Sequence, residues 1–394
     1  MANRSAALLG LYYFSFFAAA GIYVPYLGLY TRGLGFASLQ IGFIAALTPL
    51  SKILFPPVWG AIADRTGSRK SLILLTTALS VAAFSLLFVA HGFAAVSLAF
   101  LAYAFFHAPI LALSETLVLE ESARSGFLYG RIRVWGSLGY LLAALILGKV
   151  LDLTSLETFV TAFVAVSLLQ LGAALGLPAA AAPRAQRTAR GILEQLRRKD
   201  VVAFLVACTL MEVSHSGYNG FFSIHLSENG YSKSAIGPLV ALPVFCEIAA
   251  MMVADGWMRR WGSRWMMSLA FGAAVIRWSV LALTTAWVPI ALSQTLHALT
   301  YGFFHVTAVH AARGFFPAHL QASAQSLYIG LTYGVGGAVG LLAAGHLYDA
   351  WGGRVLFLIC AGVALLGLPL VLRRNRPEER PSCPTGALTD ARLG

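Results

Sequence analysis

The sequence predicts an all-α integral membrane protein with twelve transmembrane helices, arranged as two six-helix pseudo-repeats. Three observations lead to this prediction: the composition, the spacing of the apolar stretches and an internal repeat. Of the 394 residues, 58% are hydrophobic and only 11% are charged, and the mean hydropathy is +0.75. This small number of charged side chains cannot cover a water-soluble surface. We therefore expect the chain to lie in a lipid bilayer.

Apolar stretches long enough to cross a membrane recur along the whole chain. One helical crossing needs about 20 apolar residues. Stretches of roughly this length run over residues 6–30, 39–63, 71–90, 93–116, 130–151, 157–177, 201–226, 235–257, 264–285, 287–309, 322–348 and 353–373. The first stretch lacks a small-residue cleavage site, so we expect a retained helix rather than a signal peptide.

The basic residues predict the orientation of the chain. Of the 28 Lys and Arg residues, 22 fall on the side of both termini, four on the opposite side and two inside an apolar stretch. Basic loops face the cytoplasm, so both termini are expected there, in a bacterial cytoplasmic (inner) membrane. We expect a six-helix bundle over 1–177, a cytoplasmic linker over 178–200, a second six-helix bundle over 201–373 and a disordered tail over 374–394.

The chain also matches itself at an offset close to 195 residues. The matches are Gly35 with Gly230, Ile41-Gly42 with Ile236-Gly237, Arg65-x-Gly67-Ser68-Arg69 with Arg260-x-Gly262-Ser263-Arg264, Tyr103-x-Phe105-Phe106-His107 with Tyr301-x-Phe303-Phe304-His305, and Gly148 and Asp152 with Gly345 and Asp349. An ordered series at nearly one offset predicts two parallel six-helix repeats. This is the plan of a rocker-type transporter, whose substrate site lies at mid-depth between the halves.

Several kinds of chemistry have no support in the sequence. The net charge of +12 comes from short basic clusters between apolar runs, as in loops at an anionic membrane face, so nucleic-acid binding is not expected. The four cysteines form no CxxC pair and no disulfide framework. The signatures of metalloproteases, serine hydrolases and nucleotide-driven pumps are missing. We therefore expect no catalytic residue, no metal and no cofactor, with a proton gradient as the energy source.

Ionisable side chains in mid-stretch are candidates for a functional site, because each costs about 2.5 to 3.5 kcal/mol at the bilayer centre. Lys52 lies midway along the second stretch, and the 195 offset relates it to Glu247, so the halves carry opposite charges at equivalent depth. Arg277 and His297 are also in mid-stretch. The seventh stretch adds three polar residues on one helix face: Glu212, His215 and Asn219. The alternative is that these charges pair only to hold the helices together.

A loop after the second stretch carries a family signature. The segment Gly60-Ala-Ile-Ala-Asp64-Arg65-Thr-Gly67-Ser-Arg69-Lys70 resembles the loop two-three signature of the major facilitator superfamily. The segment from Asp255 to Arg264 resembles its echo in the second half. The resemblance implies the major facilitator fold. It also implies that the loop holds the two halves together in one state, with gating roles for Gly60, Asp64, Arg65, Gly67 and Arg69.

Within that superfamily the chain is similar to the oligosaccharide:proton symporter and phenylpropionate permease group, which includes lactose-permease-like carriers. The residues that carry the similarity are Glu115, Gly130 to Ser137, Ser214-His215, Tyr218 to Phe221, Arg277-Trp278 and Leu296-His297. The resemblance implies that Glu115 and Arg133 bind the substrate. It also implies that Arg277 and His297 belong to the proton and substrate machinery.

Two positions depart from the lactose-permease-like pattern. Tyr140 replaces a Trp that stacks on sugar, and Thr300 replaces a proton-carrying Glu. Glu247 instead resembles the phenylpropionate permease pattern, in which Lys52 takes the place of an Arg. The candidate proton-coupling residues are therefore Glu247, Arg277, His297 and Glu212. The candidate substrate-binding residues are Lys52, Glu115, Arg133, Tyr140, His215, Asn219 and Arg277.

These features predict a monomeric proton symporter that imports a small organic solute across the bilayer. Three fixed cations, Lys52, Arg133 and Arg277, favour an anion in a dehydrated site, and we expect an aromatic or hydrophobic monocarboxylate such as a phenylpropionate-like acid. A sugar or nucleoside proton symporter is the first alternative. A drug/proton antiporter is the second, although the Gly-Pro pair typical of its fifth helix is absent here. An enzyme is not expected, because only His215 beside a serine offers a loose nucleophile and base.

Overall fold

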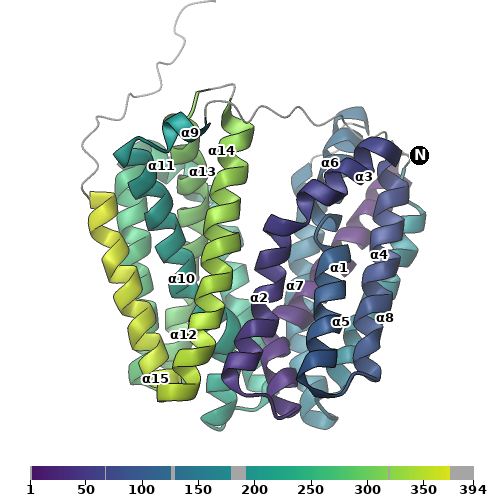
Figure 1. Ribbon diagram of the computed structural model, residues 1–394, viewed down its shortest axis with the longest axis horizontal. Coiled ribbons are helices and arrows are strands. Elements are labelled where there is room, and N and C mark those ends of the chain that lie inside the picture. Colours follow the sequence, from purple (N-terminus) through teal and green to yellow (C-terminus); the bar gives the residue numbers. More distant parts are fainter. Residues whose placement is uncertain (1, 67, 126–128, 179–191, 318–319, 373–394) are drawn as a thin grey trace, which may run out of the picture.

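The computed structural model describes residues 2–66, 68–125, 129–178, 192–317 and 320–372, which form two helical bundles side by side (Figure 1). The first half contains α1 (Ala2–Gly33), α2 (Ser38–Leu54), α3 (Pro56–Thr66), α4 (Arg69–Ser85), η1 (Leu86–Phe88), α5 (Gly92–His107), α6 (Ile110–Ser125), α7 (Tyr129–Leu153) and α8 (Thr158–Leu175). The second half follows α9 (Ile192–Gln195) and contains α10 (Lys199–Glu228), α11 (Lys233–Leu283), α12 (Trp287–Thr295), η2 (Ala298–Phe303), α13 (Phe304–Phe315), α14 (Gln321–Ile329), η4 (Gly330–Gly336) and α15 (Gly337–Leu372).

Among the described residues, nine helical stretches are long and apolar enough to cross a membrane. Three further crossings are not counted separately in this number. The stretch Ser323–Leu372 is two helices joined at Gly352, where φ is 73°. The pair α2 and α3, and the series α12, η2 and α13, each form one interrupted crossing. The twelve predicted crossings are therefore confirmed, whereas the predicted tail and most of the predicted linker lie outside the described residues.

Proline and glycine set the breaks between these helices. Helix α2 ends at Leu54 and α3 begins at Pro56, because proline has no backbone N–H to continue the hydrogen bonds of α2 but fits a first helical turn. Gly262 has a φ of 74° inside α11, a value that glycine adopts without steric cost. It separates two crossings within the echo of the loop signature, whereas Gly67 of the first copy lies outside the described residues.

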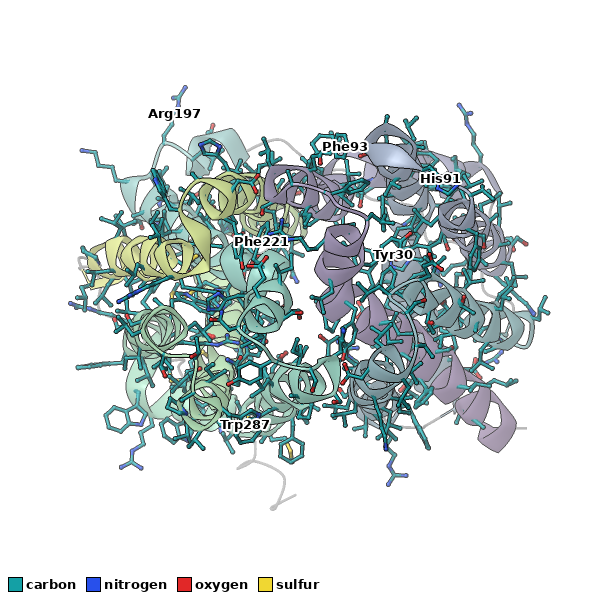
Figure 2. All side chains as sticks on the ribbon, turned by 90° about the horizontal axis from the view of Figure 1, so that it is seen from below. Tyr30, His91, Phe93, Arg197, Phe221 and Trp287 are labelled. Carbon is teal, nitrogen blue, oxygen red and sulfur yellow. The ribbon has the colours of Figure 1, made fainter. Side chains whose placement is uncertain are left out.

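The two halves converge at one end and diverge toward the end where α9 lies (Figure 1). We call these the far end and the linker end. In the view from the far end, Tyr30 lies in the first half and Phe221 in the second, on either side of their boundary (Figure 2). Helices α1, α2 and α7 contact α10, α11 and α15 across this boundary. The mid-depth residues of these six helices are therefore placed to form a site between the halves.

Two aspartates related by the repeat close the far end. Asp349 of α15 accepts hydrogen bonds from the first two backbone N–H groups of α2, both at 2.8 Å. Asp152 of α7 accepts from the first two backbone N–H groups of α11, at 2.9 and 2.8 Å. Unpaired N–H groups and the helix dipole favour a negative charge at this position. Each half therefore caps one helix of the other half.

Glycines bring the backbones together beside these caps. A Cβ atom at Gly345 would lie 2.5 Å from the carbonyl oxygen of Ser38, and a Cβ atom at Gly148 would lie 2.5 Å from that of Lys233. A real side chain cannot approach a backbone carbonyl so closely, so residues without a Cβ let the helices approach one another here. The repeated Gly and Asp of the sequence thus form two matched contacts between the halves.

We expect Asp349→Ala to loosen the far end, because losing a helix cap costs about 1 kcal/mol. The open fraction should then rise about fivefold. The measurement is the alkylation rate of a cysteine placed at Ala46, which is 1% exposed where α2 packs on α15, in a chain whose native cysteines are replaced by serine. Asp200→Ala removes a carboxylate at the linker end and is the control. Equal rates in Asp349→Ala and its parent would contradict the capping role.

Candidate functional site

A buried arginine lies at the centre of the second half. Arg277 of α11 is 0% exposed. Its guanidinium donates to His297 Nδ1 at 2.9 Å and to Gln294 Oε1 at 2.8 Å, and it reaches Thr300 Oγ1 at 3.3 Å. All three acceptors are neutral groups. A buried charge is costly unless dipoles or an opposite charge compensate it, so these acceptors help to keep Arg277 charged inside the bundle.

Two aromatic rings complete the surroundings of Arg277. Its guanidinium carbon lies 4.3 Å from the centre of the Tyr218 ring and 4.7 Å from that of Trp278. Contacts of this kind contribute up to about 2 kcal/mol when the cation is desolvated. The indole N–H of Trp278 reaches Ser214 Oγ at 3.4 Å. Helix α10 therefore supports the arginine through Tyr218 as well as through Ser214.

His297 connects Arg277 to Glu247. Because Arg277 donates to Nδ1 of His297, that nitrogen is the acceptor and the ring proton sits on Nε2. Nε2 lies 3.4 Å from Glu247 Oε2. The hydrogen-bond pattern thus assigns a neutral histidine between a cation and a carboxylate. The three residues predicted to act together, Glu247, Arg277 and His297, are indeed brought together.

Thr300 takes a direct part in this network. Its hydroxyl accepts from Arg277 and lies 3.2 Å from His215 Nε2. The other ring nitrogen of His215 lies 2.8 Å from the carbonyl oxygen of Met211, so it carries the proton and Nε2 accepts from Thr300. Where lactose-permease-like carriers have a carboxylate, this chain has a neutral relay. Glu247 of α11 provides the carboxylate instead.

The acid that interacts with Lys52 is Glu212 of the second half. The repeat places Lys52 and Glu247 at equivalent depth, but Lys52 of α2 interacts electrostatically with Glu212 of α10. The side chain of Lys52 is exposed although it lies in a transmembrane helix. Helix α2 packs against α10 and α15, whereas α11 packs against α7. Lys52 and Glu247, although related by the repeat, therefore interact with different partners.

Glu247 instead faces Arg133 across the boundary between the halves. Arg133 of α7 interacts electrostatically with Glu247 of α11. The guanidinium carbon of Arg133 lies 4.1 Å from the centre of the Phe17 ring. Each half therefore presents one cation and one acid to the other: Lys52 to Glu212, and Glu247 to Arg133.

The remaining predicted substrate residues lie around this boundary with weaker connections. No ion pair joins Glu115 to Arg133 in the described part of the chain. Tyr140 is half-buried and interacts electrostatically with Tyr218 and Glu247. Asn219 is exposed. Only Tyr140 thus shows a link to the charged cluster.

The predicted gating loop forms a contact inside the first half. Arg69 is 1% exposed and pairs with Glu120 of α6, so it ties α4 to α6 rather than to the other half. Arg65 is exposed, and a side chain at Gly60 would meet open space. Gly67 and the side chain of Asp64 lie outside the described residues. The gating roles of these five positions stay predictions.

Sequence reasoning missed two polar positions of this region in the second half. Gln294 is 0% exposed and accepts from Arg277. It precedes His297 by three residues, a spacing that places both on one helix face, so the sequence held the signal. Tyr333 donates to or accepts from His305 Nδ1 at 3.0 Å. It lies in a π-helical segment, which the spacing of apolar residues does not reveal.

Comparison with known proteins identifies the family. The described residues contain no group of three metal-binding side chains. The model of the MFS_1 like family matches residues 7–359. The chain belongs to this family. The protein therefore has the major facilitator fold that the loop signature and the repeat predict.

Relatives of this protein cover nearly its whole length. It is 28% identical to the "Probable 3-phenylpropionic acid transporter" of Escherichia coli (strain K12), over 97% of this chain and 100% of the relative. It is 30% identical to the maltose permease of Geobacillus stearothermophilus, over 93% and 94%. The crystal structure of the nucleoside transporter NupG shares its fold, with a TM-score of 0.83 at 19% identity, over 93% of this chain and 98% of NupG. The protein is an integral membrane transporter of a small molecule, not an enzyme.

Proposed function

We propose that this protein is a proton symporter that imports a small organic anion, with an aromatic or hydrophobic monocarboxylate as the substrate class. The observation that carries the proposal is a pair of electrostatic interactions across the boundary between the halves, Lys52 with Glu212 and Arg133 with Glu247. A carboxylate that enters between the halves can replace either acid beside its cation. The substrate carboxylate and the acid then compete for the same cation, so binding of the substrate favours protonation of the displaced acid.

The first step is the binding of the anion to Arg133 and Lys52. Arg133 offers a planar guanidinium that fits a carboxylate with two hydrogen bonds, and its position over Phe17 leaves an aromatic face beside it. Lys52 is exposed and adds a second positive charge. The aromatic body of the substrate would lie near Phe17 and Tyr140. This arrangement favours a hydrophobic acid over a dicarboxylate.

The second step is the protonation of Glu247. Once the substrate occupies Arg133, Glu247 loses its cation in a site with little water, and the neutral acid is favoured. His297 keeps its Nε2–H directed at Glu247, because Arg277 occupies Nδ1. Arg277 and His297 therefore act as positioning residues. The loaded carrier holds one anion and one proton with no net change in charge, which lowers the cost of moving through the bilayer.

The predicted orientation of the chain identifies which end of the transport path faces outward. With both termini in the cytoplasm of a bacterial inner membrane, the capped far end faces outward, and this conformation is one in which the outward path is closed. Alternating access then requires the Asp152 and Asp349 caps to release. The protein acts as a monomer in this scheme, because both members of each charge pair and of each cap come from one chain.

A neutral sugar or nucleoside is the second candidate substrate. It is supported by the maltose permease relative and by the nucleoside transporter of the same fold. In that case the acids rather than the cations would contact the substrate, through hydrogen bonds to hydroxyl groups. A drug/proton antiporter, the other alternative, has support only from a 76-residue match to a multi-drug efflux pump that covers 18% of this chain.

We expect 3-phenylpropionate to stabilise the purified protein against heat, and 3-phenylpropionamide to leave it unchanged. The two probes differ in charge and hardly in shape, so the comparison isolates the carboxylate. A ligand at a hundredfold its Kd stabilises by about 2.7 kcal/mol, which a thermal-shift assay in detergent detects. Maltose and a nucleoside complete the panel. Stabilisation by either of these, with no effect of the acid, would reject the anion and favour the second candidate.

A further inference from the structure

A second histidine lies on the linker side of Glu247. A Cβ atom at Gly302 would lie 3.4 Å from Glu247 Cγ, so the glutamate packs against η2, between His297 and His305. Glu247 contacts His297 at 3.4 Å and interacts electrostatically with His305. The proposed function uses His297 only. His305 is a half-buried titratable group that it leaves without a role.

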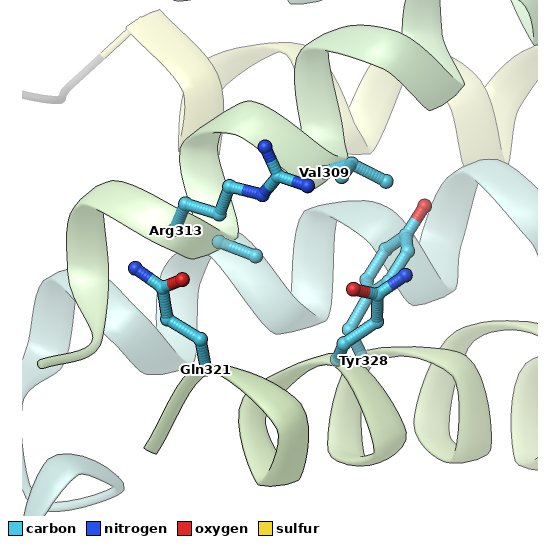
Figure 3. A pocket seen from close by; sticks show the side chains of 6 residues that line it. Val309, Arg313, Gln321 and Tyr328 are labelled. Carbon is cyan, nitrogen blue, oxygen red and sulfur yellow. The ribbon is translucent and has the colours of Figure 1, made fainter. Parts of the chain in front are cut away.

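Hydrogen bonds lead from His305 toward the linker end. His305 Nδ1 lies 3.0 Å from the hydroxyl of Tyr333, and that hydroxyl lies 3.2 Å from the hydroxyl of Tyr328. Tyr328 is 1% exposed and lines a small pocket at the linker end of α13 and α14 (Figure 3). The other residues that line it are Val309, Ala312, Arg313, Gln321 and Gln325. A line of exchangeable protons thus runs from mid-depth to this small pocket.

Two π-helical segments shape this line. Helix η2 carries Tyr301 and η4 carries Tyr333, and the centres of these two rings are 6.4 Å apart. The Tyr301 ring stacks between His297, at 5.2 Å, and His305, at 6.2 Å, with 9° between the planes in each case. Single turns of π-helix inside α-helices occur frequently at functional sites. Here they bring the stacked rings and the hydrogen-bonded hydroxyls together.

The repeat supplies an internal comparison. His107, the counterpart of His305, stacks on Phe16 at 5.4 Å and on Tyr103 at 4.9 Å. Within the part of the chain that the structure describes, the His107 ring has no hydrogen bond. The relay of hydroxyl groups therefore belongs to the half that contains Glu247.

We propose that His305, Tyr333 and Tyr328 form the route by which the proton of Glu247 leaves toward the linker end. The route rests on the proposed function. Glu247 gives its proton, through a bridging water molecule, to Nε2 of His305, whose Nδ1–H passes to the oxygen of Tyr333. The hydroxyl proton of Tyr333 moves to Tyr328, and that of Tyr328 moves to water in the pocket. Each step transfers one proton between groups that both donate and accept, so water is the only further reactant.

The groups that face His305 agree with this route. Glu247 of α11, Tyr301 of η2 and Tyr333 of η4 surround it. Glu212 of α10 interacts electrostatically with Tyr333. Glu247 is thus the acid whose charge acts on His305, and it supports a positive charge on the ring while the proton passes.

The experiment compares Tyr333→Phe with Tyr12→Phe in vesicles loaded with a pH-sensitive dye. Tyr333→Phe removes one hydroxyl from the route. Tyr12→Phe removes a buried hydroxyl that is bonded to Ser114 in the first half, at 2.8 Å, and is the matched control. We expect Tyr333→Phe to slow substrate-driven proton movement about tenfold, with exchange of internal for external 3-phenylpropionate unchanged. His305→Gln should give the same result, because its amide cannot pass a proton on.

The outcomes separate the route from the proposed function. If the parent protein moves protons with 3-phenylpropionate and both variants match it, the route is wrong and the symport stands. If the parent moves no protons with the substrate, the proposed function fails and the route fails with it. If exchange falls as much as proton movement in both variants, the residues serve the conformational change, and the route is rejected.

Discussion

Glu247→Gln is expected to abolish accumulation of substrate driven by a pH gradient while sparing exchange of internal for external substrate. The amide copies the neutral acid, so the variant resembles the loaded carrier at all times. Exchange needs only this loaded form, whereas net transport requires the proton to leave. The loss should reach the background of empty vesicles. The two measurements are uptake of labelled 3-phenylpropionate into acid-outside vesicles and counterflow in vesicles preloaded with unlabelled substrate.

A matched control is Glu157→Gln, which makes the same change at an exposed glutamate at the far end. Both activities should survive in it. If Glu247→Gln still concentrates substrate, Glu247 is structural. Glu212, which faces Lys52, and Glu115 would then be tested by the same pair of assays.

Arg133→Gln should weaken binding of the carboxylate substrate by about 1.5 to 3 kcal/mol, the range for hydrogen bonds to charged groups. This corresponds to a rise in Kd of roughly tenfold to a hundredfold. Arg133→Lys keeps the charge but loses the planar fork over Phe17, so it should lose less. Isothermal titration with 3-phenylpropionate gives all three Kd values. Equal Kd values in Arg133→Gln and the parent would remove Arg133 from the substrate site.

Lys52 requires a paired design because it faces Glu212. Lys52→Met alone leaves that acid without its cation, and a loss of binding could then reflect a disturbed bundle. Lys52→Met combined with Glu212→Gln removes both charges and should restore thermal stability but not affinity. Restored affinity in the double variant would show that Lys52 serves only as a partner of Glu212.

The fold could be predicted from the sequence because the bilayer imposes one length on every crossing. The repeat predicted more than the apolar stretches did, because it identified Asp152 and Asp349 as equivalent residues from the sequence alone. It could not reveal that each aspartate caps a helix of the opposite half. That contact depends on how closely the halves approach, which in turn depends on Gly148 and Gly345.

At mid-depth, the repeat does not predict which charged residues face each other. A rotation relates Lys52 to Glu247, and residues related in this way face each other only if they lie on the axis. Helix α2 instead packs on α10 and α15, while α11 packs on α7, so each residue meets a different partner. The charges were identified by their cost in the membrane. Their pairing depends on the packing between the halves, which the sequence pattern does not contain.

The tyrosine route shows a second limit of sequence reasoning. The pair His107 and His305 matches in sequence, and both lie among aromatic residues. Only the π-helical turns of η2 and η4 distinguish them, because an extra residue in a turn changes which side chains share a face. Periodicity of apolar residues assumes a regular helix and so cannot detect such a turn.

The most direct test of the central claim is the number of protons taken up when substrate binds. Purified protein in weakly buffered detergent solution should take up one proton for each 3-phenylpropionate bound, because the anion displaces Glu247 from Arg133. The affinity should accordingly fall by up to tenfold per pH unit at alkaline pH, where the proton is no longer available. Glu247→Gln should bind the anion without proton uptake and without this pH dependence. Saturable binding to the parent protein with no proton uptake at any pH would contradict the account.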